Sequence, residues 1–377
     1  MPKWWVHRAV SSAQVREIEE KMQWHHARNS LADLRKVLTY TCDERLLRPD
    51  LKSKFVQLQA SERTFSFVKA HPPHGLAGSW LRRVAGMLMT NTDANTLLNM
   101  YQMHVLDTEQ VRQLLTGRSH ALDAPPADAV SEQGRRERGG PSSTGSDAAD
   151  SPEASEGGGG TQAGGGAADT LGRLLDVGAG DGCCTAKLAP LFHSVSCTEV
   201  SRPASWRLRQ RGFDAHLTAD LDHFDAGAFD VISCLNVLDR CTHPRALLAS
   251  LHRLATRAPL PPAEPGTAEG HERQAGGREE RGVARVLLAV VLPYRAMVEA
   301  GAMGSVVRQS QDLDLDWDSP SWEESVNALV QKALEPAGFR VTSFSRVPYI
   351  CQGDLGKPLY TLDDVVFVME PCGAEAV

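Results

Sequence analysis

A glycine-rich segment directly after a short apolar run constrains the fold of this chain more than any other feature. Residues 174–177 favour a buried strand, and Gly178, Gly180 and Gly182 then predict a tight turn. The residues that follow, 183–192, favour the start of a helix. Because glycine has no Cβ atom, a strand, a glycine turn and a helix N-terminus together let the backbone approach a bound ligand closely. The sequence therefore predicts a ligand site at this turn, with an ordinary βα turn as the alternative.

The spacing of the glycines distinguishes between classes of ligand. A dinucleotide-binding fingerprint, G-x-G-x-x-G, would need its third glycine where Cys183 stands. This chain instead has G-x-G-x-G, and Asp176 precedes the first glycine by two residues. That pattern resembles the first motif of the class I S-adenosylmethionine-dependent methyltransferases.

Strands and helices alternate along the C-terminal half of the chain. Short apolar segments predict strands at 173–177, 194–200, 215–218, 229–235 and 285–292. Helices are expected at 204–211, 244–254 and 322–337. Two long strands, 339–349 and 362–369, then form a terminal antiparallel hairpin. This order predicts an α/β, Rossmann-like fold of the class I methyltransferase type, with a mostly parallel sheet of seven strands.

The N-terminal part of the chain is expected to be helical. Apolar periodicity predicts helices within residues 13–36, 51–71 and 76–90. Residues 99–106 resemble a short extended segment, and Asp107 or Thr108 would then cap another helix. We expect this region, residues 1–121, to cover one edge of the catalytic core.

Two low-complexity stretches interrupt the folded parts. The only large apolar residue in 127–170 is Val130, and the only one in 258–282 is Leu260. Neither stretch buries enough apolar surface to offset the entropy of ordering, so both are expected to be disordered. The predicted organisation is therefore a helical region, a disordered insertion at 122–170, and a methyltransferase domain at 171–372 that contains the second insertion.

The overall composition argues against several classes of protein. The net charge of −7 disfavours a nucleic-acid-binding protein. The N-terminus, MPKWWVHRAVSS, lacks the apolar run of a secretory signal, and no apolar run approaches the ~20 residues of a membrane span. The eight cysteines show no metal-binding spacing. We therefore expect a cytoplasmic monomer with reduced cysteines and no metal.

Acidic residues follow two of the predicted strands and are candidates for cofactor binding. Glu199 ends the second strand, and ligands of open α/β sheets bind outside the carboxyl ends of the strands. A carboxylate at this place can accept hydrogen bonds from a ribose diol, although a surface glutamate at a strand end is the alternative. Asp220, just past the third strand, could contact the amino group of an adenine.

Asn236 and Asp239 follow the fourth strand, in the segment SCLNVLDRC. They are three residues apart, so a helical turn would direct both side chains the same way. Such a pair could orient a nitrogen nucleophile. The alternative is that Asn236 caps a turn while Asp239 pairs with Arg240 or Arg245 at the surface.

Several segments together resemble one family, the DREV methyltransferases. They are LLDVGAGDG, CTEVS, FDVISCLNVLDRC, VLLAVVLPY, WEESVNAL, AGFRVTSFSRVPYICQGD and LDDVVFVMEP. The family is known for methylating the pros ring nitrogen of protein histidines at His-x-His motifs. The resemblance therefore implies S-adenosylmethionine as the cofactor and proteins with such motifs as substrates.

The resemblance also implies roles for individual residues. The cofactor turn would be shaped by Asp176, Gly178, Gly180, Asp181 and Gly182, with Glu199 on the ribose. Asn236 and Asp239 would hold the target imidazole, and Tyr349 and Tyr360 would line the substrate pocket.

The expected chemistry suits histidine. An imidazole with an ordinary pKa of about 6.5 is mostly neutral at pH 7, so one ring nitrogen keeps a lone pair. Asp239 would accept a hydrogen bond from the other ring nitrogen, and Asn236 would fix the orientation of the ring. Two alternatives stay open: a methyltransferase for another nitrogen or oxygen acceptor, such as a small molecule, and a non-catalytic scaffold with this fold.

Overall fold

The computed structural model describes residues 31–117, 170–256, 283–299, 306–307, 312–313, 315, 321–354 and 359–372. The helix expected from residue 13 falls on these residues only in its last part. The expected insertions lie outside them, apart from Thr170 at the end of the first.

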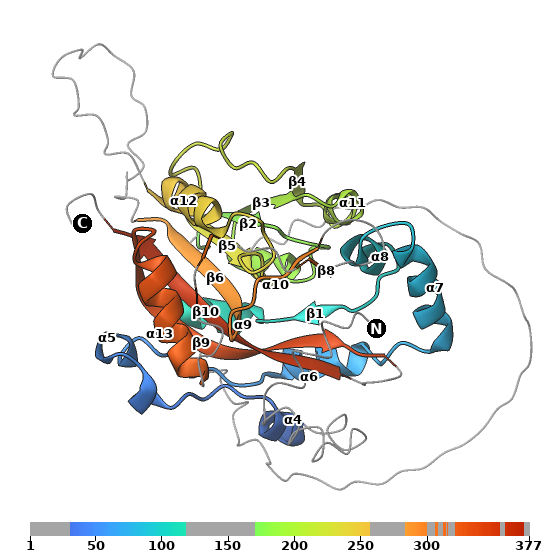
Figure 1. Ribbon diagram of the computed structural model, residues 1–377, viewed down its shortest axis with the longest axis horizontal. Coiled ribbons are helices and arrows are strands. Elements are labelled where there is room, and N and C mark those ends of the chain that lie inside the picture. Colours follow the sequence, from blue (N-terminus) through green and yellow to red (C-terminus); the bar gives the residue numbers. More distant parts are fainter. Residues whose placement is uncertain are drawn as a thin grey trace, which may run out of the picture.

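Within these residues the main sheet has eight strands in the order β1-β9-β10-β6-β5-β2-β3-β4 (Figure 1). The parallel strands are β2 (Arg173–Val177), β3 (Ser194–Glu199), β4 (Asp214–Leu217), β5 (Val231–Leu235) and β6 (Arg285–Leu292). The antiparallel hairpin consists of β9 (Phe339–Gln352) and β10 (Leu359–Pro371), and β10 pairs with β6. The class I methyltransferase fold predicted from the sequence is confirmed.

The sheet differs from the prediction at the edge formed by β9. A short strand, β1 (Met103–His104), pairs with β9 antiparallel and brings the described sheet to eight strands rather than seven. Nearby, the helix predicted within 51–71 is confirmed at Glu62–Ala70, but the residues around Phe55 are not helical. Phe55 forms a parallel bridge with Phe344, and Val56 N donates to Phe344 O at 2.8 Å. Both additions supply hydrogen-bond partners to the outer edge of β9.

Helices cover both faces of the sheet. One face packs against α5 (Pro49–Lys52), α12 (Pro244–Ala255) and α13 (Trp322–Leu329), which continues as a π-helical turn at Val330–Leu334. The other packs against α4 (Leu31–Val37), α6 (Glu62–Ala70), α9 (Thr108–Thr116) and α10 (Thr185–Leu188). Short 3-10 turns lie at Glu44–Leu46 and Ala189–Leu191, and a separate ribbon pairs β7 (Val298–Glu299) with β8 (Val306–Val307).

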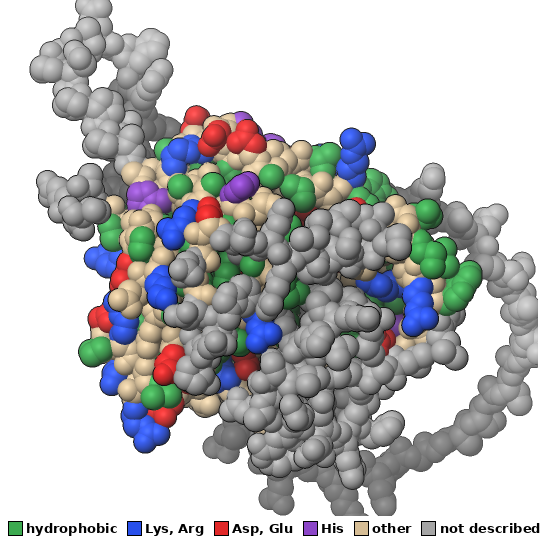
Figure 2. Space-filling view, viewed as in Figure 1, with side chains coloured by type: hydrophobic (Ala, Val, Ile, Leu, Met, Phe, Trp, Pro, Cys, Tyr) green, Lys and Arg blue, Asp and Glu red, His purple; other side chains and the backbone are tan. Residues whose placement is uncertain are grey.

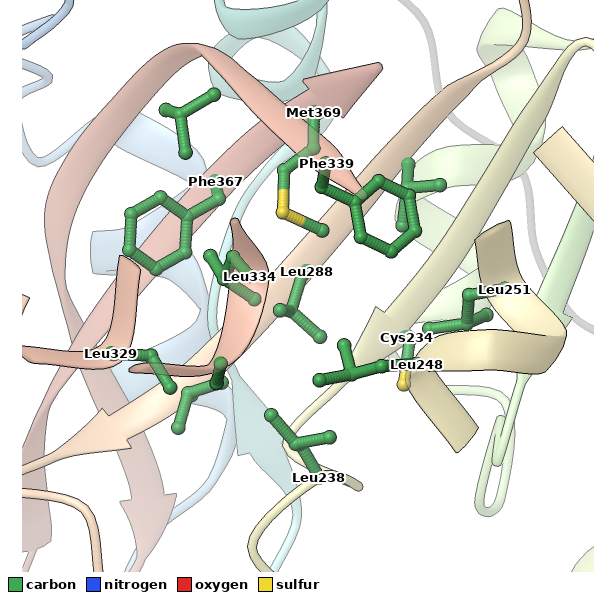
Figure 3. Packing of buried hydrophobic residues seen from close by; sticks show 14 of the residues in the cluster. Cys234, Leu238, Leu248, Leu251, Leu288, Leu329, Leu334, Phe339, Phe367 and Met369 are labelled. Atoms are coloured by element: carbon green, nitrogen blue, oxygen red, sulfur yellow. The ribbon is translucent and has the colours of Figure 1, made fainter. Parts of the chain in front are cut away.

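The central strands are buried on both sides, which explains their continuous apolar sequences. In β6, Leu288 belongs to the cluster beneath α12, and its neighbour Leu287 belongs to the cluster on the opposite face. Figure 3 shows Leu288 among Leu248 and Leu251 of α12 and the aromatic rings of the C-terminal hairpin. This double layer holds the carboxyl ends of the parallel strands in place.

Three further helices gather at one end of the molecule (Figure 1). They are α7 (Leu76–Gly86), α8 (Asn91–Leu97) and α11 (Arg202–Gln210). Arg82 Nε donates to Asn95 Oδ1 at 2.9 Å, and Arg207 Nη1 donates to Asn99 Oδ1 at 2.9 Å. The two arginines thus join α7 and α11 to the α8 region. No helix in the described ranges has the length and apolar character needed to cross a membrane.

Candidate functional site

The glycine turn after β2 has the backbone conformation that its sequence predicts. Gly178, Gly180 and Gly182 have φ values of 67°, 60° and 82°, which favour glycine over other residues. A Cβ atom on Gly178 would lie 2.6 Å from Val237 Cγ2, and one on Gly182 would lie 2.9 Å from Leu208 Cδ2. A Cβ atom on Gly180 would meet no atom within 4 Å. Two of the glycines therefore permit close packing, and Gly180 faces open space that a ligand can approach.

Glu199 lies at the end of β3 beside this turn, as predicted. Its Oε2 accepts a hydrogen bond from Gly180 N at 2.8 Å, and its Oε1 accepts from Val200 N and Ser201 N at 2.8 Å each. Burial raises its pKa, and the three backbone donors oppose that rise. Since a carboxylate offers roughly four lone-pair sites, Glu199 holds the turn and keeps acceptor capacity for a ligand hydroxyl.

Asp176 supports the glycine turn through hydrogen bonds to the neighbouring strand and helix. Its Oδ1 accepts from Ser233 Oγ and its Oδ2 from Thr185 Oγ1, both at 2.6 Å. The side chain thus ties β2 to β5 and to α10. Burial raises its pKa to about 6, and the two hydroxyl donors oppose the shift. Asp176 shapes the cofactor turn without facing the open side at Gly180.

The other two predicted cofactor acids occupy different settings. Asp181 Oδ1 accepts from Cys183 N at 3.0 Å, and its carbonyl accepts from Arg211 Nε at 2.8 Å. Asp181 therefore braces the turn against α11. Asp220 is exposed in the loop after β4, the edge strand, and its Oδ1 accepts from Asp222 N at 2.8 Å. A contact between Asp220 and an adenine stays a prediction.

A turn in the segment SCLNVLDRC begins one residue later than predicted, since Arg240 N and Cys241 N donate to Val237 O at 2.9 and 3.0 Å. Asn236 has a φ of 58° and forms a bend directly after β5, where its backbone N donates to Ala289 O at 2.9 Å. Val237 packs on Gly178, and Leu238 is buried in the core beneath α12. Both residues between Asn236 and Asp239 are therefore apolar packing residues. Asp239 lies in this turn and Asn236 lies before it, so the prediction of one helical turn that contains both residues is wrong.

Asn236 is instead paired across the sheet. Its Nδ2 donates to Asp364 Oδ2 at 2.7 Å, and both side chains are buried. This contact uses the amide nitrogen and leaves the carbonyl oxygen, Oδ1, without a hydrogen-bond partner among the described residues. Asp364 lies in the middle of β10, and the sequence reasoning missed it. The available signal was an acidic residue inside the otherwise apolar strand LDDVVFVM.

Asp239 is fully buried, so the alternative is wrong in placing it at the surface, although it does pair with Arg240 as that alternative expected. Its Oδ1 lies 3.9 Å from Arg240 Nε, and its backbone oxygen accepts from Met297 N at 2.7 Å. The guanidinium carbon of Arg240 lies 5.8 Å from the ring centroid of Tyr349. Asp239, Arg240 and Tyr349 thus form a charged and aromatic group beside the Asn236 bend.

Tyr349 and Tyr360 lie on one face of the hairpin. Tyr349 pairs with Leu362, Tyr360 pairs with Cys351, and strand alternation puts Asp364 on the same face. Both rings are buried, and burial raises the pKa of both phenols, so they are protonated at neutral pH.

Two residues that were not predicted extend this aromatic group. Asp354 Oδ2 accepts from the hydroxyl of Tyr360 at 3.1 Å and from the hydroxyl of Tyr101 at 3.1 Å. Tyr101 follows α8 and has a φ of 56°. The N-terminal region therefore contributes a side chain to the hairpin, which its sequence did not predict.

Together these contacts join two loops at the carboxyl ends of the strands. Val237 contacts the glycine turn, and its neighbour Asn236 contacts Asp364. A ligand on the open side of Gly180 would therefore be bound close to the buried polar group at Asn236. This arrangement suits the transfer of a chemical group from one molecule to another.

Comparisons with known proteins agree with this layout. The model of the DREV methyltransferase family matches residues 162–260 and 277–371, slightly more than half of the 377 residues. The match includes the glycine turn, the Asn236 bend and the C-terminal hairpin.

Solved structures with partial similarity include the N-methyltransferase NodS from Bradyrhizobium japonicum in complex with S-adenosylhomocysteine, at 15% identity and a TM-score of 0.29, covering 53% of this chain and 78% of that one. The DhpI–SAH complex is 14% identical with a TM-score of 0.31, and the match covers 53% of this chain and 77% of that one. A SAM-dependent methyltransferase from Leishmania major is 13% identical with a TM-score of 0.31, and the match covers 54% of this chain and 65% of that one.

Proposed function

The chain belongs to the DREV methyltransferase family, and from that premise we propose that it methylates histidine in proteins and forms pros-methylhistidine at His-x-His motifs. The coarser activity, S-adenosylmethionine-dependent methyl transfer, follows from the family. What we propose beyond it is that histidine receives the methyl group, and that the pros nitrogen of its ring is the one methylated.

The residues present fit S-adenosylmethionine. Gly180 faces open space at a positive φ, and Glu199 stands beside it with acceptor capacity for a hydroxyl group. When bound, the cofactor supplies a methyl group on a positively charged sulfur, which a nitrogen lone pair can attack in line. The protein's own task is to hold the turn open and to bind the substrate at the adjacent polar group, with a nitrogen lone pair directed at that methyl group.

The observation that carries the proposal is the fixed orientation of Asn236. Because the amide nitrogen donates to Asp364, the buried oxygen Oδ1 is the atom of Asn236 that remains to accept a hydrogen bond from a substrate that enters this group. A neutral imidazole has one N–H donor and one lone pair. Asn236 Oδ1, rather than Asp239 as expected from the sequence, then accepts this N–H, and the other nitrogen keeps the lone pair that methylation needs.

The charged residues near Asn236 also favour an imidazole as the group that is methylated. Methylation converts a neutral imidazole into a cation; the carboxyl group of Asp364 contacts Asn236, and that of Asp239 is buried three residues further along the chain. Negative charge at fixed positions stabilises a developing positive charge, most strongly where water is excluded. Arg240 next to Asp239 limits the net negative charge before the substrate binds.

The test is methyl transfer from labelled S-adenosylmethionine to the peptide Ala-His-Ala-His-Ala, beside two control peptides in which either histidine is alanine. We expect incorporation that requires both histidines, and product analysis that shows pros-methylhistidine. Binding of S-adenosylmethionine with no incorporation into any peptide would refute the histidine acceptor and leave the methyltransferase activity intact. The search would then move to small-molecule acceptors.

A further inference from the structure

Helix α7 presents a stripe of apolar side chains to solvent. Trp80, Leu81 and Val84 are exposed on the helix, and Met87 and Leu88 are exposed in the turn directly after it. The most exposed are Leu88, at 78%, and Trp80, at 65%. Their spacing puts them along one side of a helix. Figure 2 shows hydrophobic side chains gathered over this part of the molecule, at the right edge of the view.

The apolar surface extends beyond α7. Leu97 of α8 is 53% exposed and Trp206 of α11 is 57% exposed. Arg82 and Arg207 bind the α8 region from either side and hold the three helices together. Exposed apolar surface shared by several helices is typical of an interaction site. We call the exposed residues of α7, its following turn, α8 and α11 the α7–α11 face.

The charge of this face is opposite to the charge of the chain. The helices α7 and α11 carry five arginines and no acidic residue, and α8 adds one acid, Asp93, which accepts a hydrogen bond from Ser201; the whole chain has a net charge of −7. Arg83 and Arg202 are exposed, and Arg202 lies one helical turn from Trp206. Basic residues beside exposed tryptophan and leucine side chains are the combination found in helices that lie at a membrane surface.

We propose that the α7–α11 face docks on the surface of an anionic lipid bilayer. Trp80 and Leu88 enter the interface between headgroups and acyl chains, and Arg83 and Arg202 contact the anionic headgroups. Tryptophan favours this depth because its ring is apolar and its N–H is polar. Docking would concentrate the enzyme near membrane-associated substrates, which goes beyond the proposed methyl transfer.

Charge argues against a symmetric second copy of the chain as the occupant. A twofold interface would bring the arginines of both copies into one contact area, where α7 and α11 hold no acidic residue to pair with them. An anionic bilayer complements both the charge and the apolar stripe.

The test is flotation of the full chain with vesicles of phosphatidylcholine and phosphatidylserine, and with vesicles of phosphatidylcholine alone. We expect binding to the anionic vesicles only, and weaker binding as salt is raised, because salt screens the arginines. The variant Trp80→Ser with Leu88→Ser should lose binding. Its matched control is Leu46→Ser, at an exposed leucine of another helical turn that should bind normally.

The charge contribution is tested separately. Arg83→Gln with Arg202→Gln should weaken binding roughly tenfold at low salt, whereas Arg45→Gln, at another exposed arginine, should have little effect. Cofactor binding by each variant shows that it is folded. The proposal is overturned if the full chain does not float with anionic vesicles, or if the Trp80 and Leu88 variant floats as well as the parent. It is also overturned if the chain forms a dimer that this variant abolishes.

Discussion

The side-chain amide of Asn236 donates a 2.7 Å hydrogen bond to Asp364 across the carboxyl end of β5 and the middle of β10. The contact joins residues 128 positions apart and determines which atom of Asn236 is available to a substrate. Asp364 is therefore a positioning residue in the proposed reaction, because it acts through Asn236.

Replacing Asp364 with asparagine should reduce turnover without removing the cofactor. The variant keeps the shape of the side chain but can present either its oxygen or its NH2 group, so Asn236 can turn over and kcat for peptide methylation should fall by about tenfold to a hundredfold. Calorimetry should show unchanged binding of S-adenosylmethionine. The matched control is Asp363→Asn, whose side chain pairs with Arg346 on the other face of β10. Equal losses in both variants would show that Asp364 has no specific part in orienting Asn236.

Asp239 should matter to the rate and little to cofactor affinity. In Asp239→Ala the carboxyl group beside Arg240 is lost, so the cation formed on the imidazole is less stabilised and kcat should fall by at least about a hundredfold. Thermal unfolding and cofactor calorimetry separate this effect from a loss of structure. If a folded Asp239→Ala protein methylates peptides at the parent rate, the proposed role of Asp239 is wrong.

The glycines of the turn should differ in what they support. Gly180→Ala introduces a side chain into open space at a positive φ, so stability should fall by only about 1 kcal/mol while cofactor affinity drops sharply. Gly178→Ala would place its Cβ 2.6 Å from Val237, and it should destabilise the fold more. Denaturation curves and calorimetry on both variants test the difference. Equal destabilisation would contradict the distinct roles assigned to the two positions.

Asp176 should make stability depend on pH in an unusual direction. Its pKa in the folded chain is about 6, above its ordinary value of 3.8, so the charged form disfavours the folded state above pH 6. As pH falls from 6 towards 4 the folded state takes up a proton and this penalty is relieved, by about 3 kcal/mol in total.

The measurement compares the unfolding free energies of the parent and Asp176→Asn from pH 7 to pH 4. The parent should gain stability relative to the variant as pH falls, since the variant has no group to protonate at this position. A difference that stays constant over this range would show that the pKa of Asp176 is not raised.

Local patterns were sufficient for the order of the core elements. The strands β2 and β6 begin and end at the predicted residues, because each is a continuous apolar run bounded by residues that favour turns or loops. The helix cap was also predictable: Asp107 Oδ1 accepts from Glu109 N and Gln110 N at 2.9 Å each, a contact made within one turn.

Contacts between distant segments were not predictable in the same way. Phe55 and Phe344 pair at the edge of β9, yet the apolar residues around Phe55 were interpreted as part of a helix. Short apolar runs suit either a strand or a buried helix, and the available partner decides between them. The unoccupied edge of β9 provided that partner.

The sequence alone determined the α/β fold, the glycine turn and the position of Glu199 beside it, because spacing along the chain and strand ends set these features. Only the tertiary structure decided that Asn236 turns its amide to Asp364, that Asp239 is buried beside Arg240, and that Tyr101 reaches the hairpin. The contact between Asn236 and Asp364 depends on how β5, β6 and β10 pair, and the other two depend on how a turn and the N-terminal region pack on the sheet. Segments far apart along the chain decide these contacts, so local patterns do not predict them.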